Sequence, residues 1–349
     1  MIIDIIKVTI PLTISFVVGL VVVAPILLVY LYRHKMWKKI SGKVDLSGKD
    51  TPVFNALHKE KDTNTPRMGG VVIWLSVLFT IGIVWLLAEF FPGPVTSKLN
   101  FLSRNQTWLP LFTLVAASIV GLFDDYLTVR GSGLSLRHRI IVVLGLGAVG
   151  AWWFYFKLGI STIFIPFFGP GSLGLLFIPL FMLVMLGLFS GGVIDGLDGL
   201  SGGVMIGIFA AYTGIAFYQQ QIDLATFNAV ILGGILAFLW YNVPPARFYM
   251  TETGILGLTT TLTVVAFLTD AVIFLPLIAL PLVATTASNI IQLSSKKFLG
   301  RKVFLSAPMH HHFEALGWPA HQVTMRYWIV GLVCAVLGFV LTILGKLAL

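Results

Sequence analysis

Long apolar runs, separated by short polar segments, make up most of this chain. A run of about 20 apolar residues is long enough to cross the hydrocarbon core of a bilayer as an α-helix. We predict ten such spans, at residues 8–32, 68–91, 109–127, 139–158, 174–191, 203–219, 226–242, 255–270, 271–293 and 327–348. The pattern predicts an all-α integral membrane protein, in which residues 1–349 form a single polytopic transmembrane domain.

The boundary between the eighth and ninth spans is placed at Asp270. Residues 255–293 are too long for one upright helix. Asp270 is followed by Pro276 and Pro281, which favour a break in the helix. We therefore expect a tight turn and re-entry there.

Basic residues are distributed unevenly between alternate loops. Eighteen of the 23 Lys and Arg residues lie in the loops that follow spans one, three, five, seven and nine. Cytoplasmic loops of polytopic proteins carry such an excess. These loops are predicted to be cytoplasmic, and both termini are predicted to be periplasmic.

Composition agrees with this picture. Hydrophobic residues make up 57% of the chain and charged residues only 11%, whereas an ordinary soluble domain is about 25% charged. The net charge of +9 follows the predicted topology, so no nucleic acid partner is expected. The single cysteine, Cys334, lies in an apolar run, which excludes a disulfide framework and a cysteine metal cluster.

Polar residues of other kinds also gather on the predicted cytoplasmic side. All seven histidines lie there, together with several carboxylates. Asp124 and Asp125 lie at the end of the third span. Insertion of an aspartate at the centre of a transmembrane helix costs roughly 2.5–3.5 kcal/mol, and the cost is lower at the end of the helix. Taken alone, the pair fits equally a solvated helix end and a site that holds a cation or a proton.

The loop after the fifth span contains Asp195 and Asp198 among six glycines. If this loop is helical, the two aspartates are at i and i+3 and share a face. The glycines allow the backbone to approach a ligand closely. Packing gives no reason for two aspartates here, so we interpret the loop as functional.

Basic residues at two loops suit a phosphate ligand. Lys61, Thr65 and Arg67 precede a Gly-Gly pair, and together they offer cations and open backbone N–H groups. A solvated basic loop is the alternative interpretation. Arg130 adds a cation just after the two adjacent aspartates.

Further candidates follow the seventh and ninth spans. Asn242 closes the seventh span before two prolines, Tyr249 offers a stacking face, and Glu252 is a hard oxygen ligand. An interfacial aromatic belt with a solvated glutamate is the alternative for the last two.

Three consecutive histidines, His310, His311 and His312, resemble a zinc site at first sight. No cysteine and no His-x-x-x-His spacing accompanies them, so imidazoles that face phosphate or sugar hydroxyls fit better. The candidates together offer carboxylates for Mg²⁺, cations for a pyrophosphate and an aromatic ring for a base. This combination suits phosphoryl transfer from a soluble nucleotide-linked donor to a lipid acceptor, in a cleft at the cytoplasmic face.

The order of these motifs resembles the polyprenyl-phosphate N-acetylhexosamine-1-phosphate transferases. It looks most like their phospho-N-acetylmuramoyl-pentapeptide transferase branch, which the triple-histidine stretch marks most specifically. The resemblance covers essentially the whole chain. The matching pieces are Thr65-Pro66 with Met68-Gly69-Gly70, Gly121 with Asp124-Asp125-Tyr126, Asp195-Gly196-Leu197-Asp198-Gly199-Leu200, Asn242 with Pro245-Ala246, and Ala307-Pro308 with His310-His311-His312-Phe313-Glu314 and Gly317-Trp318.

The resemblance implies a Mg²⁺-dependent phosphotransferase of peptidoglycan biosynthesis in the bacterial cytoplasmic (inner) membrane. It would move phospho-MurNAc-pentapeptide from UDP-MurNAc-pentapeptide to undecaprenyl phosphate, giving lipid I and UMP. The family tends to dimerise, so a homodimer is a further expectation.

The resemblance also implies roles for the candidates. Asp124 would deprotonate or orient the lipid phosphate beside Asp125 and would be near the metal. Asp195 and Asp198 would contact the nucleoside and sugar-phosphate region. Tyr249 would stack on the uracil, and His311 and His312 would contact the phosphate or the sugar.

Several polar positions depart from the family pattern. Glu252 stands where the family has the aspartate that ligates Mg²⁺. Thr128 replaces a lysine, whose charge Arg130 is the candidate to supply, and Arg67 replaces a threonine, as in the GlcNAc-phosphate relatives. Two alternatives therefore stay open: transfer from UDP-GlcNAc or another UDP-HexNAc, and a catalytically inactive polyprenyl-phosphate-binding homologue.

Overall fold

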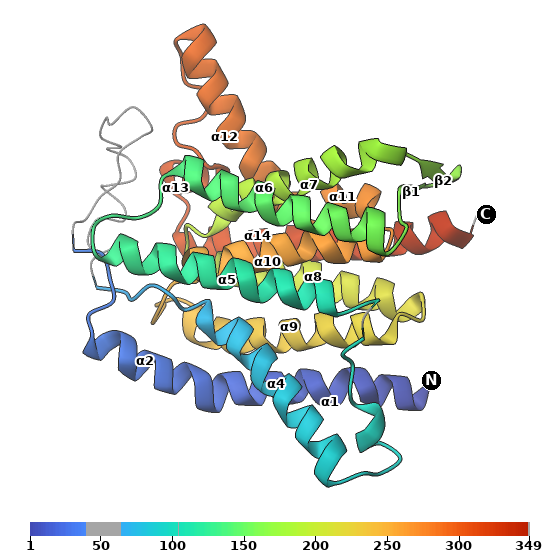
Figure 1. The fold of residues 1–349 in the computed structure, drawn as a ribbon. Coiled ribbons are helices and arrows are strands. Elements are labelled where there is room, and N and C mark those ends of the chain that lie inside the picture. The colour runs from blue at the N-terminus through green and yellow to red at the C-terminus, as the bar shows by residue number, and fades with distance from the viewer. Residues whose placement is uncertain (40–63, 104, 348–349) are drawn as a thin grey trace.

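The computed structural model describes residues 1–39, 64–103 and 105–347, and the described part is mainly helical (Figure 1). The α-helices are α1 Ile2–Val18, α2 Ala24–Arg33, α4 Val71–Phe90, α5 Trp108–Val129, α6 Leu136–Trp152, α7 Phe177–Gly191, α8 Leu200–Tyr218, α9 Ile222–Asn242, α10 Thr251–Leu268, α11 Leu275–Ile278, α12 Leu280–Leu299, α13 Met309–Ala315 and α14 Ala320–Leu347. Short π-helical turns extend two of them, at Gly19–Val23 and Trp153–Lys157. Short 3₁₀ turns lie at Thr96–Lys98, Gly174–Leu176, Gly192–Ile194 and Val272–Phe274.

Nine of the ten predicted spans agree with long described helices, whereas the ninth, 271–293, is interrupted at Ala279 between α11 and α12. Nine helical stretches in the described ranges are long and apolar enough to cross a membrane. The pair Val272–Ile278 and Leu280–Leu299 passes the same test only when its two helices are taken together, and it is bent by 79° at the break between them. The predicted division at Asp270 is confirmed, because α10 ends at Leu268 and a new helical segment begins at Val272.

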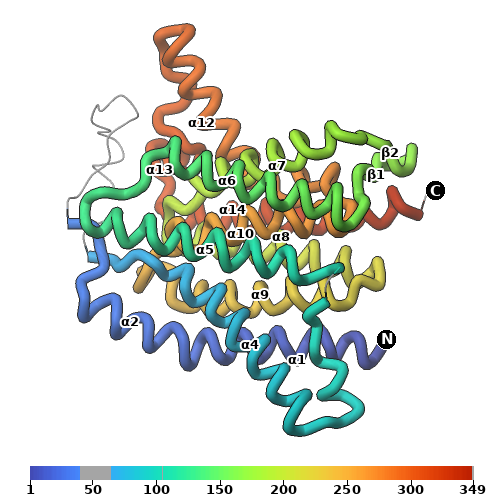
Figure 2. Tube along the Cα trace, viewed as in Figure 1, coloured from blue at the N-terminus to red at the C-terminus, as the bar shows by residue number. Residues whose placement is uncertain are grey.

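The long helices lie side by side as a bundle, with α10 at its centre (Figures 1 and 2). In the most apolar window of α10, 89% of residues are buried, so its threonines and aliphatic side chains pack on every face. Helix α5 packs along α10, α1 packs along α9, and α8 lies between α9 and α14. Helix α12 leaves the bundle at a steep angle.

A small β-hairpin departs from the predicted all-α architecture. Strand β1 (Thr162–Ile165) pairs antiparallel with β2 (Gly169–Ser172). The Asp270 carboxylate accepts a hydrogen bond from the Phe164 N–H at 2.8 Å, which ties the hairpin to the turn after α10. Burial raises the pKa of Asp270 above its usual value, and this hydrogen bond opposes the shift.

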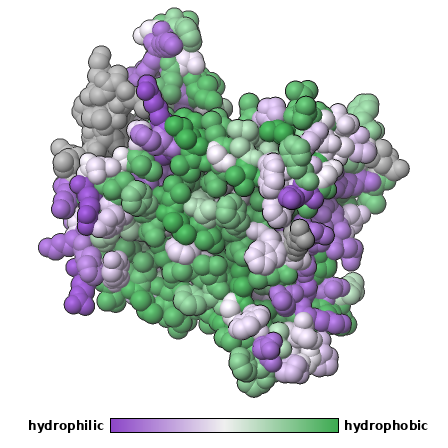
Figure 3. Space-filling view, in the orientation of Figure 1, coloured by the Kyte–Doolittle hydropathy of each residue, from purple (hydrophilic) through white to green (hydrophobic). Residues whose placement is uncertain are grey.

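The surface of the bundle is divided into zones. Hydrophobic residues form a broad band between two hydrophilic ends (Figure 3). Both chain termini lie at one end, and the loop after α5 lies at the other (Figure 1). Such an apolar band between polar ends is what a helix bundle surrounded by lipid presents.

Candidate active site

The site begins where α5 and α10 approach each other. A Cβ on Gly121 would clash with the Glu252 carbonyl oxygen and would lie 2.8 Å from the Thr253 nitrogen. The absence of a side chain at Gly121 therefore allows the last turns of α5 to lie against the first turn of α10. This contact brings the adjacent aspartates of α5 beside Glu252.

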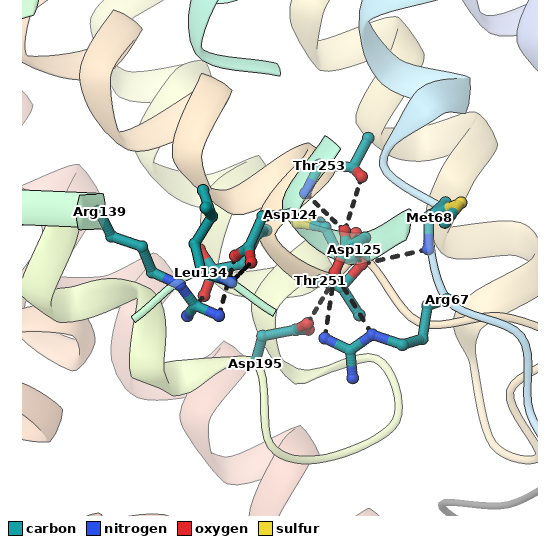
Figure 4. Close-up of polar contacts among 11 residues, drawn as sticks. Arg67, Met68, Asp124, Asp125, Leu134, Arg139, Asp195, Thr251 and Thr253 are labelled. Atoms are coloured by element: carbon teal, nitrogen blue, oxygen red, sulfur yellow. Dashed lines mark hydrogen bonds and ion pairs between the residues drawn. The ribbon is translucent and has the colours of Figure 1, made fainter. Parts of the chain in front are cut away.

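Asp125 is fully buried and joins three segments of the chain (Figure 4). Its Oδ1 accepts hydrogen bonds from Arg67, at 3.1 Å from Nη2 and 3.3 Å from Nε. Its Oδ2 accepts from the Thr251 hydroxyl at 2.5 Å, the Thr253 N–H at 2.9 Å and the Thr253 hydroxyl at 2.6 Å. An ionised carboxylate has about four lone-pair sites, so Asp125 is saturated by protein donors.

Thr251 has a strained backbone that these contacts hold in place. Its φ is +55°, in the left-handed region that a β-branched residue rarely adopts. Its hydroxyl donates to Asp125, and its N–H donates to Asp195 Oδ2 at 2.8 Å. The start of α10 is thus fixed by two aspartates from different segments, Asp125 in α5 and Asp195 in the loop before α8.

Asp124 has different partners from its neighbour. Its Oδ1 accepts the Leu134 N–H at 2.6 Å. Its Oδ2 is buried and lies 2.8 Å from Arg139 Nη2, but no hydrogen bond to Oδ2 is made within the described residues. The Arg139 Nη1 also forms an ion pair with Glu252 Oε1. Arg139 therefore bridges the two carboxylates that the sequence assigned to a metal.

The aspartate loop is a turn and not an α-helix, so the expected helical face of Asp195 and Asp198 is absent. Gly192–Ile194 is a 3₁₀ turn that ends at Asp195, and α8 begins only at Leu200. Asp195 Oδ1 accepts the Ser201 hydroxyl at 2.6 Å, while Asp198 Oδ2 accepts the Ala246 N–H at 3.2 Å. Each carboxylate is held separately.

Burial and hydrogen bonding have opposite effects on the pKa of Asp195. Burial raises the pKa of this carboxyl above its usual value, and the hydrogen bonds from Ser201 and Thr251 oppose the shift. The nearby guanidinium of Arg67 opposes the shift as well, because a positive charge stabilises the ionised carboxylate.

Asn242 is placed behind the aspartate loop. Its side chain accepts the Gly199 N–H at 3.0 Å and donates to the Phe248 carbonyl at 2.8 Å. Gly199 has φ +75°, a conformation that glycine adopts without strain. Asn242 therefore ties the aspartate loop to the segment that carries Tyr249.

A cavity of about 460 Å³ opens between these segments. Five of the predicted site residues line it: Arg67, Asp195, Asp198, Tyr249 and Glu252. Five other polar residues also line the cavity but had no predicted role: Lys38, Thr128, Arg139, Thr251 and His321.

The remaining predicted residues lie elsewhere. Asp124, Asp125 and Asn242 lie behind the cavity wall, and Thr65 precedes Pro66, whose carbonyl accepts the Tyr249 N–H at 2.9 Å. Lys61 lies outside the described residues.

Arg130 does not supply the cation beside the aspartates. It is exposed, and its guanidinium lies over the Tyr126 ring at 4.4 Å from the centroid. Arg139 supplies that charge instead. Its signal in the sequence was weak, because it is one of three arginines in the same loop and begins the next predicted span.

The three consecutive histidines make two different kinds of contact. His310 and His311 lie against the aspartate loop, and His311 Nε2 is 3.0 Å from where a Cβ on Gly196 would be. His311 Nδ1 lies 2.7 Å from Glu314 Oε2. His312 instead accepts the Leu305 N–H at 3.2 Å. The structure shows no cluster of three His, Cys, Asp or Glu side chains able to hold a metal, among the residues it describes.

Known proteins resemble this chain over nearly its whole length. The model of Glycosyl transferase family 4 matches residues 107–270, which contain α5 through α10 and the three carboxylates that line the cavity. The phospho-N-acetylmuramoyl-pentapeptide-transferase of Geobacillus thermodenitrificans is 35% identical over 95% of this chain and 96% of its own length. Relatives of the same name are 32% identical in Anoxybacillus flavithermus, over 91% of this chain and 93% of the relative, and 35% identical in Listeria innocua, over 80% and 84%. Similarity of this extent shows that the chain belongs to the phospho-N-acetylmuramoyl-pentapeptide transferase family.

Proposed function

We propose that this protein transfers phospho-MurNAc-pentapeptide from UDP-MurNAc-pentapeptide to undecaprenyl phosphate. One observation carries the proposal: a cavity with three carboxylates, those of Asp195, Asp198 and Glu252, lies between two arginines in a chain of this family. In the net reaction, an oxygen of the lipid phosphate forms a bond to the phosphorus attached to the sugar. The bond from that phosphorus to UMP breaks, which gives lipid I and UMP.

The described contacts suggest different tasks for the adjacent aspartates. Asp124 Oδ2 is a buried acceptor beside Arg139, which lines the cavity, so it suits deprotonation or orientation of the lipid phosphate. Asp125 is saturated by donors from Arg67, Thr251 and Thr253. We assign Asp125 to positioning, because it orders the segment that carries Glu252.

Among the other candidates, Tyr249, Asp198, His310 and His311 are proposed to keep their predicted binding roles. Tyr249 lines the cavity and presents its ring for stacking on the uracil, and Asp198 lines it beside Tyr249. His310 and His311 support the aspartate loop from behind, so their contacts with phosphate or sugar depend on substrate reaching that loop.

Mg²⁺ fits the carboxylates that the chain offers. Asp124 Oδ2 lacks a hydrogen bond within the described residues, and Glu252 is a second hard oxygen ligand nearby. Mg²⁺ is commonly held by one or two carboxylates, with waters and substrate phosphates as the other ligands. When bound here, the ion would neutralise charge on the pyrophosphate.

We also propose that the cavity faces the cytoplasm of a bacterial inner membrane and that both termini are periplasmic. Two observations support this orientation. The loop after α5 and the first turn of α6, which together carry three arginines, lie at the end of the bundle opposite the termini, and basic loops are predominantly cytoplasmic in polytopic proteins. A homodimer remains a prediction.

The activity is tested by UMP release from purified protein with undecaprenyl phosphate and Mg²⁺. We expect release with UDP-MurNAc-pentapeptide, and we expect Asp124→Asn to lower kcat by about 10²–10⁴-fold. Asp4→Asn is the control, because Asp4 pairs with the chain's own N-terminus at the opposite end. Release with UDP-GlcNAc alone would establish the hexosamine alternative, and no release with any UDP-sugar would favour the inactive homologue.

A further inference from the structure

Arg139 contacts both carboxylates that are proposed to hold the metal. Its Nη2 is 2.8 Å from Asp124 Oδ2, and its Nη1 pairs with Glu252 Oε1. Asp124 is 2% exposed, so its charge is almost removed from water. Two carboxylates brought together in this way need a counter-charge, because each raises the free energy of the other's ionised form. The guanidinium supplies that charge from within the chain.

The guanidinium and a divalent cation would compete for the same two oxygens. Both are positive, and their repulsion in a partly buried site is large compared with that in water. Mg²⁺ also requires near-octahedral geometry at about 2.0–2.1 Å, which leaves no room for an N–H donor on the same lone pairs.

The contacts of Arg139 allow it to leave. It lies in the first turn of α6, and its side chain is 26% exposed at the edge of the cavity. Its Nε has no hydrogen-bond partner among the described residues. Among the described residues, the partners of its guanidinium are the two carboxylates, so a competing cation would release the whole group.

We propose that Arg139 is an internal cation that competes with the divalent metal for Asp124 and Glu252. Without metal, the guanidinium holds the two carboxylates together, and metal binding displaces it toward the cavity. This inference rests on the proposed function for the metal requirement. It assigns to Arg139 a control over metal affinity that the sequence alone did not indicate.

The test measures Mn²⁺ binding to the full-length protein in detergent, by the electron paramagnetic resonance signal of free Mn²⁺, without nucleotide or lipid. We expect Arg139→Gln to bind Mn²⁺ at least about 10-fold more tightly than the wild type, since a neighbouring charge shifts the proton affinity of a carboxylate by a similar factor. Equal or weaker binding in Arg139→Gln would overturn the proposal.

Two further variants make the comparison specific. Arg137→Gln removes the same charge from an exposed position of the same helix, and its Mn²⁺ affinity is expected to stay within about 2-fold of the wild type, as for an exposed, screened charge. The double variant Arg139→Gln/Glu252→Gln should lose the added affinity. If it keeps the added affinity, the ion binds elsewhere and the proposal is wrong.

Arg139→Lys keeps the test decisive if the glutamine variant does not fold. A single ammonium cannot span both carboxylates as the fork does, so tighter Mn²⁺ binding than in the wild type is expected, and no gain would refute the proposal. The measurement uses no substrate. A wild type that binds metal as described but releases no UMP would therefore disprove the proposed function alone.

Discussion

At the scale of single residues, the centre of the site is fixed by an ion pair between Arg67 and Asp125. The Asp125 side chain is fully buried, and Arg67 is 17% exposed. A buried pair adds little net stability, but the loss of one partner leaves an uncompensated charge. Removal of either side chain alone is therefore expected to destabilise the fold.

Arg67→Met is expected to destabilise the fold by about 3–5 kcal/mol, the cost of a buried charge without its partner. Arg67→Met/Asp125→Asn should recover part of this loss, because the charge is then absent. Thermal unfolding in detergent measures both. Arg130→Met is the control, since that exposed arginine contacts only an aromatic ring in the described contacts, and its change should stay below about 1 kcal/mol. A similar loss in both single variants would contradict the prediction.

The carboxylates of the site were predictable from the sequence, but the side chains that bind them were mostly not. Carboxylates near hydrocarbon are costly, so Asp124, Asp125 and Asp195 were conspicuous in an apolar chain. The choice of Arg139 over Arg130 was not predictable, because it depends on where α6 begins and which way its first turn faces. Thr251 was also missed, since its hydroxyl and strained backbone give no pattern in the sequence.

At the scale of elements, the contact of α5 with α10 decides whether the carboxylates meet. Gly121→Ala would place a methyl group against the Glu252 carbonyl and the Thr253 N–H. We expect the helices to separate, at a cost of about 1–3 kcal/mol in the free energy of unfolding, with a loss of UMP release as well.

Gly145→Ala provides the matched comparison for that substitution. Gly145 lies in α6, and a Cβ there would have no atom within 4 Å among those of the described residues. The replacement should leave UMP release unchanged and stabilise the protein by up to about 1 kcal/mol through helix propensity. Equal effects of the two alanines on stability and activity would show that the close approach of α5 and α10 is not required.

The elements themselves were largely predictable, because membrane-length apolar runs are the strongest signal a sequence carries. The break near Asp270 followed from its charge and the two prolines. The 79° bend before α12 did not follow, because the angle depends on how α11 packs against α14. The β-hairpin likewise depends on the Asp270 contact with Phe164.

At the scale of the whole molecule, the two polar ends of the bundle can be distinguished by chemical labelling. Lys98 and Arg137 are both exposed, Lys98 beyond α4 and Arg137 at the site end of α6. Cys334 is buried, so the native background is low. We expect a membrane-impermeant maleimide to label Lys98→Cys in intact cells lacking an outer membrane barrier, and Arg137→Cys only after the inner membrane is permeabilised. The reverse pattern would invert the proposed orientation.

The two chain ends emerge from the same end of the bundle, opposite the loop after α5 (Figure 1). Reporters fused to either end would therefore sample the same compartment, and each fusion alone would test whether the termini are periplasmic. An affinity tag at either end would leave the substrate entrance unobstructed on a solid support. To observe the compartment that the cavity faces, a probe would have to be inserted in a loop between helices.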